Sequence, residues 1–322
     1  MKKQVLATIL SAAMIASFCG VSVSADEAET YTIGILQQLE HDALDAATQG
    51  FKDAVTEALG DAVTFDEQNA QNESSTCITI ANGFVSEGVD LILANGTTAL
   101  QSCQAATDTI PVLGTSITDY ATALDLEEFD GTVGSNISGT SDLAPLDEQA
   151  AMLYELFPDA ETVGILYCSG EPNSQYQADV ITTYLEEYGY TVETYSFADS
   201  NDITTVATNA ASESDVIYVP TDNTAAANTE AINNVCLDAG VPIIAGEEGI
   251  CSGCGVATLS ISYYDIGYIS GEMAVEILTG EADVSEMPIE YAPEVTKEYN
   301  AEIAEALGVE IPDDYVAIGA EE

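Results

Sequence analysis

The chain has 322 residues, of which 56 are Asp or Glu and only four are Lys or Arg, so its formal net charge is −52. Phosphate groups are bound by Lys and Arg, so this composition excludes nucleic acid and anionic membranes as partners. No run of 18 apolar residues follows the first 25, which argues against a later transmembrane helix.

Residues 1–25 have the pattern of a secretion signal. Lys2 and Lys3 precede an apolar stretch, and 23–25 is a small-residue cleavage site. Cleavage leaves two lysines against 56 acidic residues, a formal charge of −54. Cys19 opens a second possibility, a lipid-anchored protein, although Phe18 is bulky for the position before such a cut. We expect a bacterial protein that is exported and is extracellular or held at the cell surface.

A strand, a polar loop and a helix open the mature chain at 31–36, 37–42 and 43–59, and the same unit recurs at 162–167, 168–174 and 175–188. Further strands are expected at 62–65, 91–94, 112–114, 132–136, 191–195, 216–219, 243–245, 256–260 and 288–291. Further helices are expected at 74–86, 98–106, 146–157, 203–212, 225–239, 264–278 and 295–307, with 119–131 a loop or short helix.

Regular alternation of strands and helices predicts parallel sheets covered by helices on both faces. The repeated unit predicts an α/β fold of two Rossmann-like lobes joined by a hinge that the chain crosses several times. We expect an N-terminal lobe at 31–139, a C-terminal lobe at 140–260 and returning segments at 261–322. The lobe boundary is expected at 138–142, where a polar segment breaks the pattern. Gly267 and Gly271 indicate a helix that packs closely on a neighbour.

Six cysteines follow the signal, and Cys251 and Cys254 have C-x-x-C spacing in a Gly-rich loop. A local disulfide, reduced loop cysteines and metal or redox chemistry are the three interpretations of this pair. A zinc site would need a second cysteine pair or histidines, and His41 is the single histidine, so we expect no metal site. No cofactor is expected either.

Ligands of open α/β sheets bind outside the carboxyl ends of the strands, where seven polar loops of this chain converge. Thr97 and Thr98 begin a helix whose free N–H groups could hold a carboxylate. Asp222 and Glu247 end strands of the other lobe and could hold an ammonium group. Taken singly, Thr98, Ser174, Thr224 and Asp222 could equally be helix caps or turn formers.

Several short segments carry a family resemblance: 31–51, Ile110–Leu113, Thr118-Asp119, Glu171–Ser174, Asp215–Asn223 and Tyr264–Gly267. Over residues 31–310 the chain resembles the substrate-binding proteins of ABC transporters with the type I periplasmic fold, in the branch associated with tryptophan and tyrosine uptake. The resemblance implies a receptor that closes on an aromatic amino acid and delivers it to a membrane permease. It carries the binding pocket over to Gln37, His41, Thr97, Thr98, Thr118, Asp119, Asn173, Ser174, Asp222, Asn223 and Glu247.

Other functions receive less support from the residues. The first strand–helix turn has no G-x-G-x-x-G, and neither a phosphate-binding loop nor a G-x-S-x-G elbow occurs, so we expect no enzyme. A surface adhesin is a further alternative. Among ligands, the missing Trp and Arg disfavour sugars and the charge disfavours anions, which leaves a zwitterion. A branched-chain amino acid or another small metabolite stays open beside an aromatic one. We expect a monomer.

Overall fold

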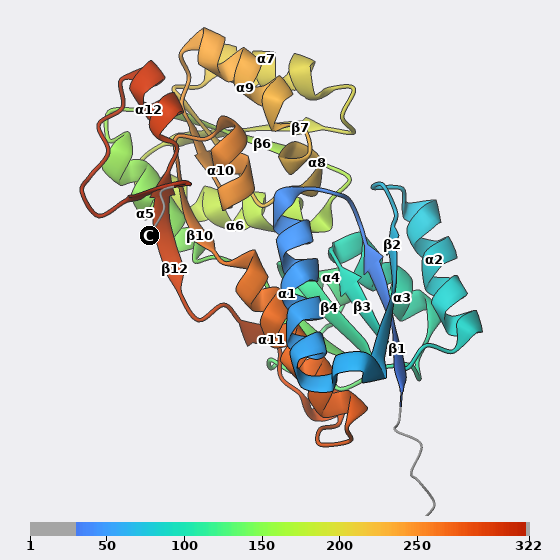
Figure 1. The fold of residues 1–322 in the computed structure, drawn as a ribbon. Helices are drawn as coiled ribbons and strands as arrows, with labels where there is room; N and C mark the ends of the chain where they lie inside the picture. The colour runs from blue at the N-terminus through green and yellow to red at the C-terminus, as the bar shows by residue number, and fades with distance from the viewer. Residues whose placement is uncertain (1–29, 320–322) are drawn as a thin grey trace, which may run out of the picture.

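The structure, a computed structural model, describes residues 30–319. The expected signal peptide and Cys19 lie outside the described residues. Two α/β lobes lie end to end, each with its own sheet (Figure 1). This confirms the predicted fold class. Within the described part of the chain, no helix is long and apolar enough to cross a membrane.

The first sheet has six strands in the order β11-β5-β4-β3-β1-β2, and every neighbouring pair is parallel. The bounds are β1 Tyr31–Gln37, β2 Val63–Asn69, β3 Leu91–Asn95, β4 Val112–Ile117, β5 Ile137–Ser141 and β11 Glu290–Tyr291. The central strands are continuous buried runs, as expected of parallel strands covered on both faces.

Two groups of helices cover this sheet. Apolar residues of α1 and α11 pack on one face, and those of α2, α3 and α4 pack on the other. The bounds are α1 Asp42–Leu59, α2 Ser74–Glu87, α3 Thr97–Ala106, α4 Tyr120–Leu124 and α11 Tyr263–Leu278, with short 3-10 turns at Gly60–Ala62 and Val284–Glu286. A β-carbon at Gly267 would overlap the backbone of Ala47 in α1, and one at Gly271 would overlap that of Phe51. The predicted close packing of this helix is therefore confirmed.

The second sheet has seven strands in the order β13-β12-β10-β9-β8-β6-β7. All pairs are parallel except β10 with β12, which is antiparallel. The bounds are β6 Thr162–Cys168, β7 Thr191–Phe197, β8 Val216–Val219, β9 Ile243–Ala245, β10 Ala257–Ile261, β12 Val295–Tyr299 and β13 Val316–Ala317.

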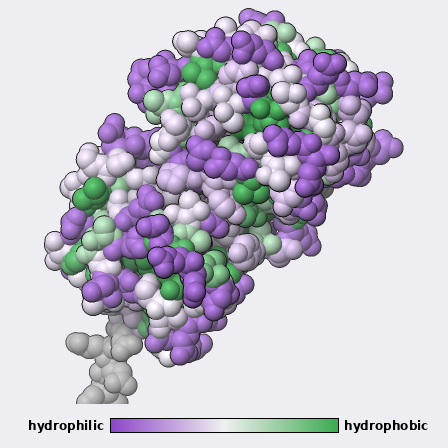
Figure 2. Space-filling model, turned by 180° about the vertical axis from the view of Figure 1, so that it is seen from behind, coloured by the Kyte–Doolittle hydropathy of each residue, from purple (hydrophilic) through white to green (hydrophobic). Residues whose placement is uncertain are grey.

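Helices α5, α6 and α12 cover one face of the second sheet, and α7 to α10 cover the other. The bounds are α5 Leu146–Leu156, α6 Pro172–Glu187, α7 Ile203–Glu213, α8 Asn223–Ala226, α9 Thr229–Ala239, α10 Glu248–Cys254 and α12 Ala301–Leu307. Hydrophilic residues cover most of the face seen in Figure 2, with hydrophobic ones in small groups. The apolar side chains thus lie mainly between the sheets and their helices.

The chain crosses between the lobes after β5, between β10 and α11, and between β11 and β12. Residues 138–141, expected to separate the lobes, instead belong to β5 and pair with β4. The first crossing therefore lies at 142–145. The exact division of the chain into lobes stays a prediction.

Three predicted elements are wrong. The helix expected at 295–307 is the strand β12 followed by α12, because 295–299 pairs with β10 and Asn300 caps the helix after it. No strand forms at 132–136, where Thr132 makes only an isolated bridge to Pro288. The helix expected at 225–239 is broken into α8 and α9 at Asn228, whose backbone is not helical.

Candidate functional site

The carboxyl ends of the two sheets face each other, and side chains from the two lobes meet between them. His41, after β1, is hydrogen-bonded through Nε2 to Oδ1 of Asn223, after β8, at 3.1 Å. Asn72 donates to Thr224 Oγ1 at 3.0 Å, and Gln177 donates to Thr118 Oγ1 at 3.5 Å. The lobes therefore contact each other directly in this structure.

A small cavity of about 10 Å³ lies at the centre of this contact. Its lining comes from both lobes and from the hinge: His41, Leu44, Asp142, Thr221, Asp222, Asn223, Ala226, Glu247 and Tyr263. Such a volume is at the lower limit for one water molecule. A larger solute can enter this central cavity only when the lobes separate, although a wider cleft of about 380 Å³, lined by residues such as Asn72 and Thr98 of the first lobe and Glu171 and Thr224 of the second, lies between the lobes as well.

Asp222 and Glu247, expected as ammonium acceptors, both line the cavity, but both also cap helices. Asp222 accepts from the N–H of Cys168 at 2.6 Å and from that of Ala225 at 2.8 Å. Glu247 accepts from the N–H groups of Gly249 and Ile250. Burial raises the pKa of Glu247 to about 7, and burial together with the nearby Glu171 also raises the pKa of Asp222. Each carboxylate therefore has a structural role, whatever it does for a ligand.

Asp142 is a cavity carboxylate that the sequence reasoning missed. It lies at the first hinge crossing, and its Oδ2 accepts from the Tyr263 hydroxyl at 3.0 Å. Its Oδ1 is buried and has no hydrogen-bond partner among the described residues. Burial raises its pKa to about 6, opposed by the hydroxyls of Thr118 and Tyr263. The Thr118 hydroxyl lies near the carboxylate but does not meet hydrogen-bond geometry with Oδ1. A buried carboxylate oxygen without a donor is a place where a ligand's N–H can bind.

Glu171, at the start of α6, organises the second-lobe side of the cleft. Its carboxylate accepts hydrogen bonds from Asn223 and Thr224, and Asn173 donates to it at 3.4 Å. Asn173 and Ser174 also donate to the carbonyl of Thr221, while Oδ1 of Asn173 is buried and has no partner within residues 30–319. The structure thus brings the expected Asn173, Ser174 and Asn223 together with Asp222.

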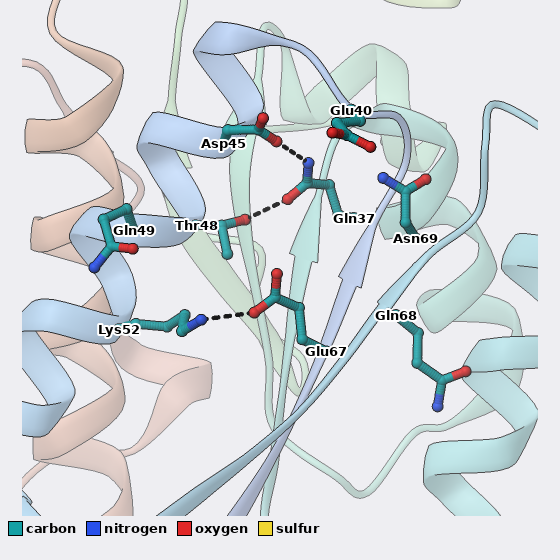
Figure 3. A pocket seen from close by; sticks show the side chains of 9 residues that line it. All are labelled: Gln37, Glu40, Asp45, Thr48, Gln49, Lys52, Glu67, Gln68 and Asn69. Carbon is teal, nitrogen blue, oxygen red and sulfur yellow. Dashed lines mark hydrogen bonds and ion pairs between the residues drawn. The ribbon is translucent and has the colours of Figure 1, made fainter.

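The first-lobe residues are less concentrated on the cavity. Gln37 points toward α1, where it donates to Asp45 at 2.6 Å and accepts from Thr48 at 2.7 Å. It lines a surface pocket that also contains the Lys52–Glu67 ion pair (Figure 3). Gln37 therefore lies away from the central cavity.

The start of α3 also differs from its expected role. The N–H of Thr98 donates to Oε1 of Gln38 at 2.9 Å, so this donor is already occupied. Thr97 and Thr118 are both buried at the cleft end of the first sheet. Asp119 is half-buried and caps α4 by accepting from Thr122 at 2.7 Å. Of these four, Thr118 alone has a hydrogen bond across to the second lobe.

Burial controls the ionisation of the remaining reactive groups. It lowers the pKa of His41, which favours the neutral imidazole. All six cysteines of the described chain are buried free thiols, and burial raises the pKa of Cys251 and Cys254 well above its ordinary value. These two lie in the helix α10 and not in a loop, which corrects the expectation. Among the described residues no group of His, Cys, Asp or Glu could hold a metal ion.

Comparison with known proteins identifies the family. The model of the ABC transporter substrate-binding proteins matches residues 32–322, so the chain belongs to this family. The family consists of binding receptors and not of enzymes. A curated relative, the tyrosine-binding protein of Clostridioides difficile, is 34% identical over 288 residues, covering 88% of this chain and 83% of the relative.

Two solved structures support the same family assignment. An ABC domain in complex with L-Trp from Streptococcus pneumonia has a TM-score of 0.84 at 31% identity, covering 88% of this chain and 97% of that one. The ligand-free, open structure of a substrate-binding protein with adhesive properties from Clostridium difficile has a TM-score of 0.70 at 34% identity, covering 91% and 100%. The higher score belongs to the less identical protein, which fits the direct lobe-to-lobe contacts found here. The chain as a whole is thus more similar to the ligand-bound relative than to the open one.

Proposed function

We propose that the protein is the exported receptor of an ABC importer, and that it binds an aromatic amino acid between its lobes. The observation that carries the proposal is Asp142, a buried carboxylate with a free oxygen on a cavity lined by both lobes. An α-ammonium group supplies the donor that this oxygen lacks. The relatives that bind tyrosine or are complexed with L-Trp favour an aromatic side chain over a branched-chain one.

The charges of the cleft fit a zwitterion bound without a cationic side chain. The two lysines of the described chain are paired on the surface, Lys52 with Glu67 and Lys297 with Glu155 and Asp314. The ligand's carboxylate must therefore be held by neutral donors. We assign this to the hydroxyls of Thr97 and Thr118, which are buried at the cleft end of the first sheet.

The remaining roles follow from the family. We propose that a permease in the membrane accepts the amino acid, that the receptor works as a monomer without catalysis, and that cleavage of residues 1–25 releases it unless Cys19 is lipidated. The single histidine, half-buried and paired with Asn223, gives no support to the alternative of an enzyme on a Rossmann-like sheet.

A thermal-shift panel of amino acids, sugars and nucleosides tests the ligand class. We expect L-Trp, L-Tyr or L-Phe to raise the melting temperature most, since a ligand that binds only the folded state stabilises it. Leucine and isoleucine are the matched controls, because they share the zwitterion and lack the ring. A larger shift with either of them, or with a sugar, would refute the assignment.

A further inference from the structure

Glu171 is buried, with 4% of its surface exposed, and it is saturated with hydrogen bonds. Its Oε1 accepts from the N–H and the hydroxyl of Thr224, at 2.8 and 2.6 Å. Its Oε2 accepts from the N–H and the side-chain amide of Asn223, at 3.0 and 2.8 Å. Each of these two residues is in turn a contact of the first lobe.

The carboxylate fixes which atoms the second lobe presents to the first. Because the Thr224 hydroxyl donates to Glu171, it is left to accept from Asn72 at 3.0 Å. Because the Asn223 amide nitrogen donates to Glu171, its Oδ1 faces His41, whose Nε2 must then carry the proton. Two separate chains of hydrogen bonds, one from Asn72 through Thr224 and one from His41 through Asn223, thus connect the first lobe to the two oxygens of one carboxylate.

Asn72, the first-lobe residue of the hydrogen-bond chain through Thr224, is also fixed in position. Asn72 accepts from Gln38 at 3.0 Å, and both Gln71 and Asn72 have positive φ angles, of 53° and 61°. This conformation is uncommon for residues other than glycine, and such local strain concentrates at clamps and switch regions. The turn presents the Asn72 amide to the second lobe.

We propose that Glu171 is a positioning residue for lobe closure: it orients Asn223 and Thr224 as the acceptors of a latch that holds the lobes together. Glu171 does not line the central cavity, and in the neighbouring cleft of about 380 Å³ that it does line, its carboxylate oxygens are already occupied by Asn223 and Thr224. We therefore assign it a role in lobe closure. The latch gives the closed form a share of the ligand-free population. Because a ligand trapped between closed lobes leaves only after they open, the latch also slows dissociation.

The test compares Glu171→Gln and Asn72→Ala with Glu148→Gln, a matched control that removes one exposed carboxylate from the same lobe. In Glu171→Gln, an amide N–H₂ replaces one carboxylate oxygen and faces the donors of Asn223 or Thr224, so one of the two hydrogen-bond chains between the lobes is lost. In the ligand-free protein, small-angle scattering should give a larger radius of gyration for both latch variants and an unchanged one for the control. The scattering measurement requires no ligand, so it tests the latch even if the proposed function is wrong.

A second experiment, which rests on the proposed function, measures the association and dissociation rates of L-Trp or L-Tyr by stopped flow. We expect the dissociation rate to rise about tenfold in Glu171→Gln, the size of one lost charge-assisted hydrogen bond, with the association rate and the Trp-to-Tyr preference unchanged. Asn72→Ala, which alters a surface turn, tests the same point if the buried variant folds poorly. Unchanged radii, or a changed ligand preference, would overturn the proposal.

Discussion

The substitution Asp142→Asn removes the charge of the cavity carboxylate and little else. The Asn oxygen can still accept from Tyr263, but an amide N–H₂ replaces the free Oδ1 that we assign to the ligand's ammonium group. A buried charge that loses its partner costs roughly 3–5 kcal/mol, which corresponds to at least about a hundredfold in affinity. Because Asp222 and Glu247 line the same cavity and also attract a cation, we expect the lower end of this range.

Asp142→Asn should weaken ligand binding but should not destabilise the ligand-free protein. The rise in the pKa of Asp142 from 3.8 to about 6 means that the ionised form is disfavoured by about 3 kcal/mol when the lobes are closed. Asp142→Asn removes this penalty, so its ligand-free melting temperature at pH 7.5 should equal or exceed that of the wild type. Loss of binding through misfolding would instead lower the melting temperature.

Calorimetric titration with L-Trp and L-Tyr is the assay, with Asp222→Asn as the comparison. Asp222 holds two backbone N–H groups, so its substitution should lower the melting temperature as well as affect binding. If Asp142→Asn binds within threefold of the wild type while Asp222→Asn does not bind, the ammonium acceptor is Asp222 and the reasoning from the free oxygen is refuted.

Two further predictions concern stability. The raised pKa values of Asp142 and Glu247, about 6 and 7, favour the protonated forms in the folded protein. Protonation of these two groups therefore stabilises the folded protein fully below about pH 4, and this stabilisation is lost as the pH rises through 6–7. The ligand-free melting temperature should fall between about pH 4 and about pH 7, and it should fall less in the Asp142→Asn, Glu247→Gln double variant. Gly267→Ala should lower the melting temperature by roughly 3–10 °C, because the added methyl group overlaps the Ala47 backbone. Gly83→Ala, in α2 with open space around it, is the control and should change little; equal shifts for the two glycine variants would contradict the packing of α1 on α11.

The alternation of strands and helices was predictable because parallel strands are buried on both faces and are therefore written as apolar runs, such as Leu91–Asn95. The strand Val295–Tyr299 was missed because it is largely polar and is stabilised by pairing with β10, which no local pattern reveals. Likewise, the strand at Ile137–Ser141 depends on its pairing with β4.

The candidate site was predictable to the extent that it lies at strand ends. That rule found His41, Asp222 and Glu247, which line the cavity. It could not find Asp142 or Tyr263, since these reach the cavity through the hinge crossings and meet only when the lobes are assembled. Nor could it show that Gln38 occupies the N–H of Thr98, because that contact depends on how β1 and β3 lie side by side.

Calorimetric titration of the purified mature wild-type protein with L-Trp, L-Tyr and L-Phe shows whether the protein is a receptor for an aromatic amino acid. We expect saturable binding of one ligand per chain, with a dissociation constant on the order of micromolar or below, and recovery of the amino acid chemically unchanged. An absence of heat with all three, together with saturable binding of a sugar or a branched-chain amino acid, would contradict it.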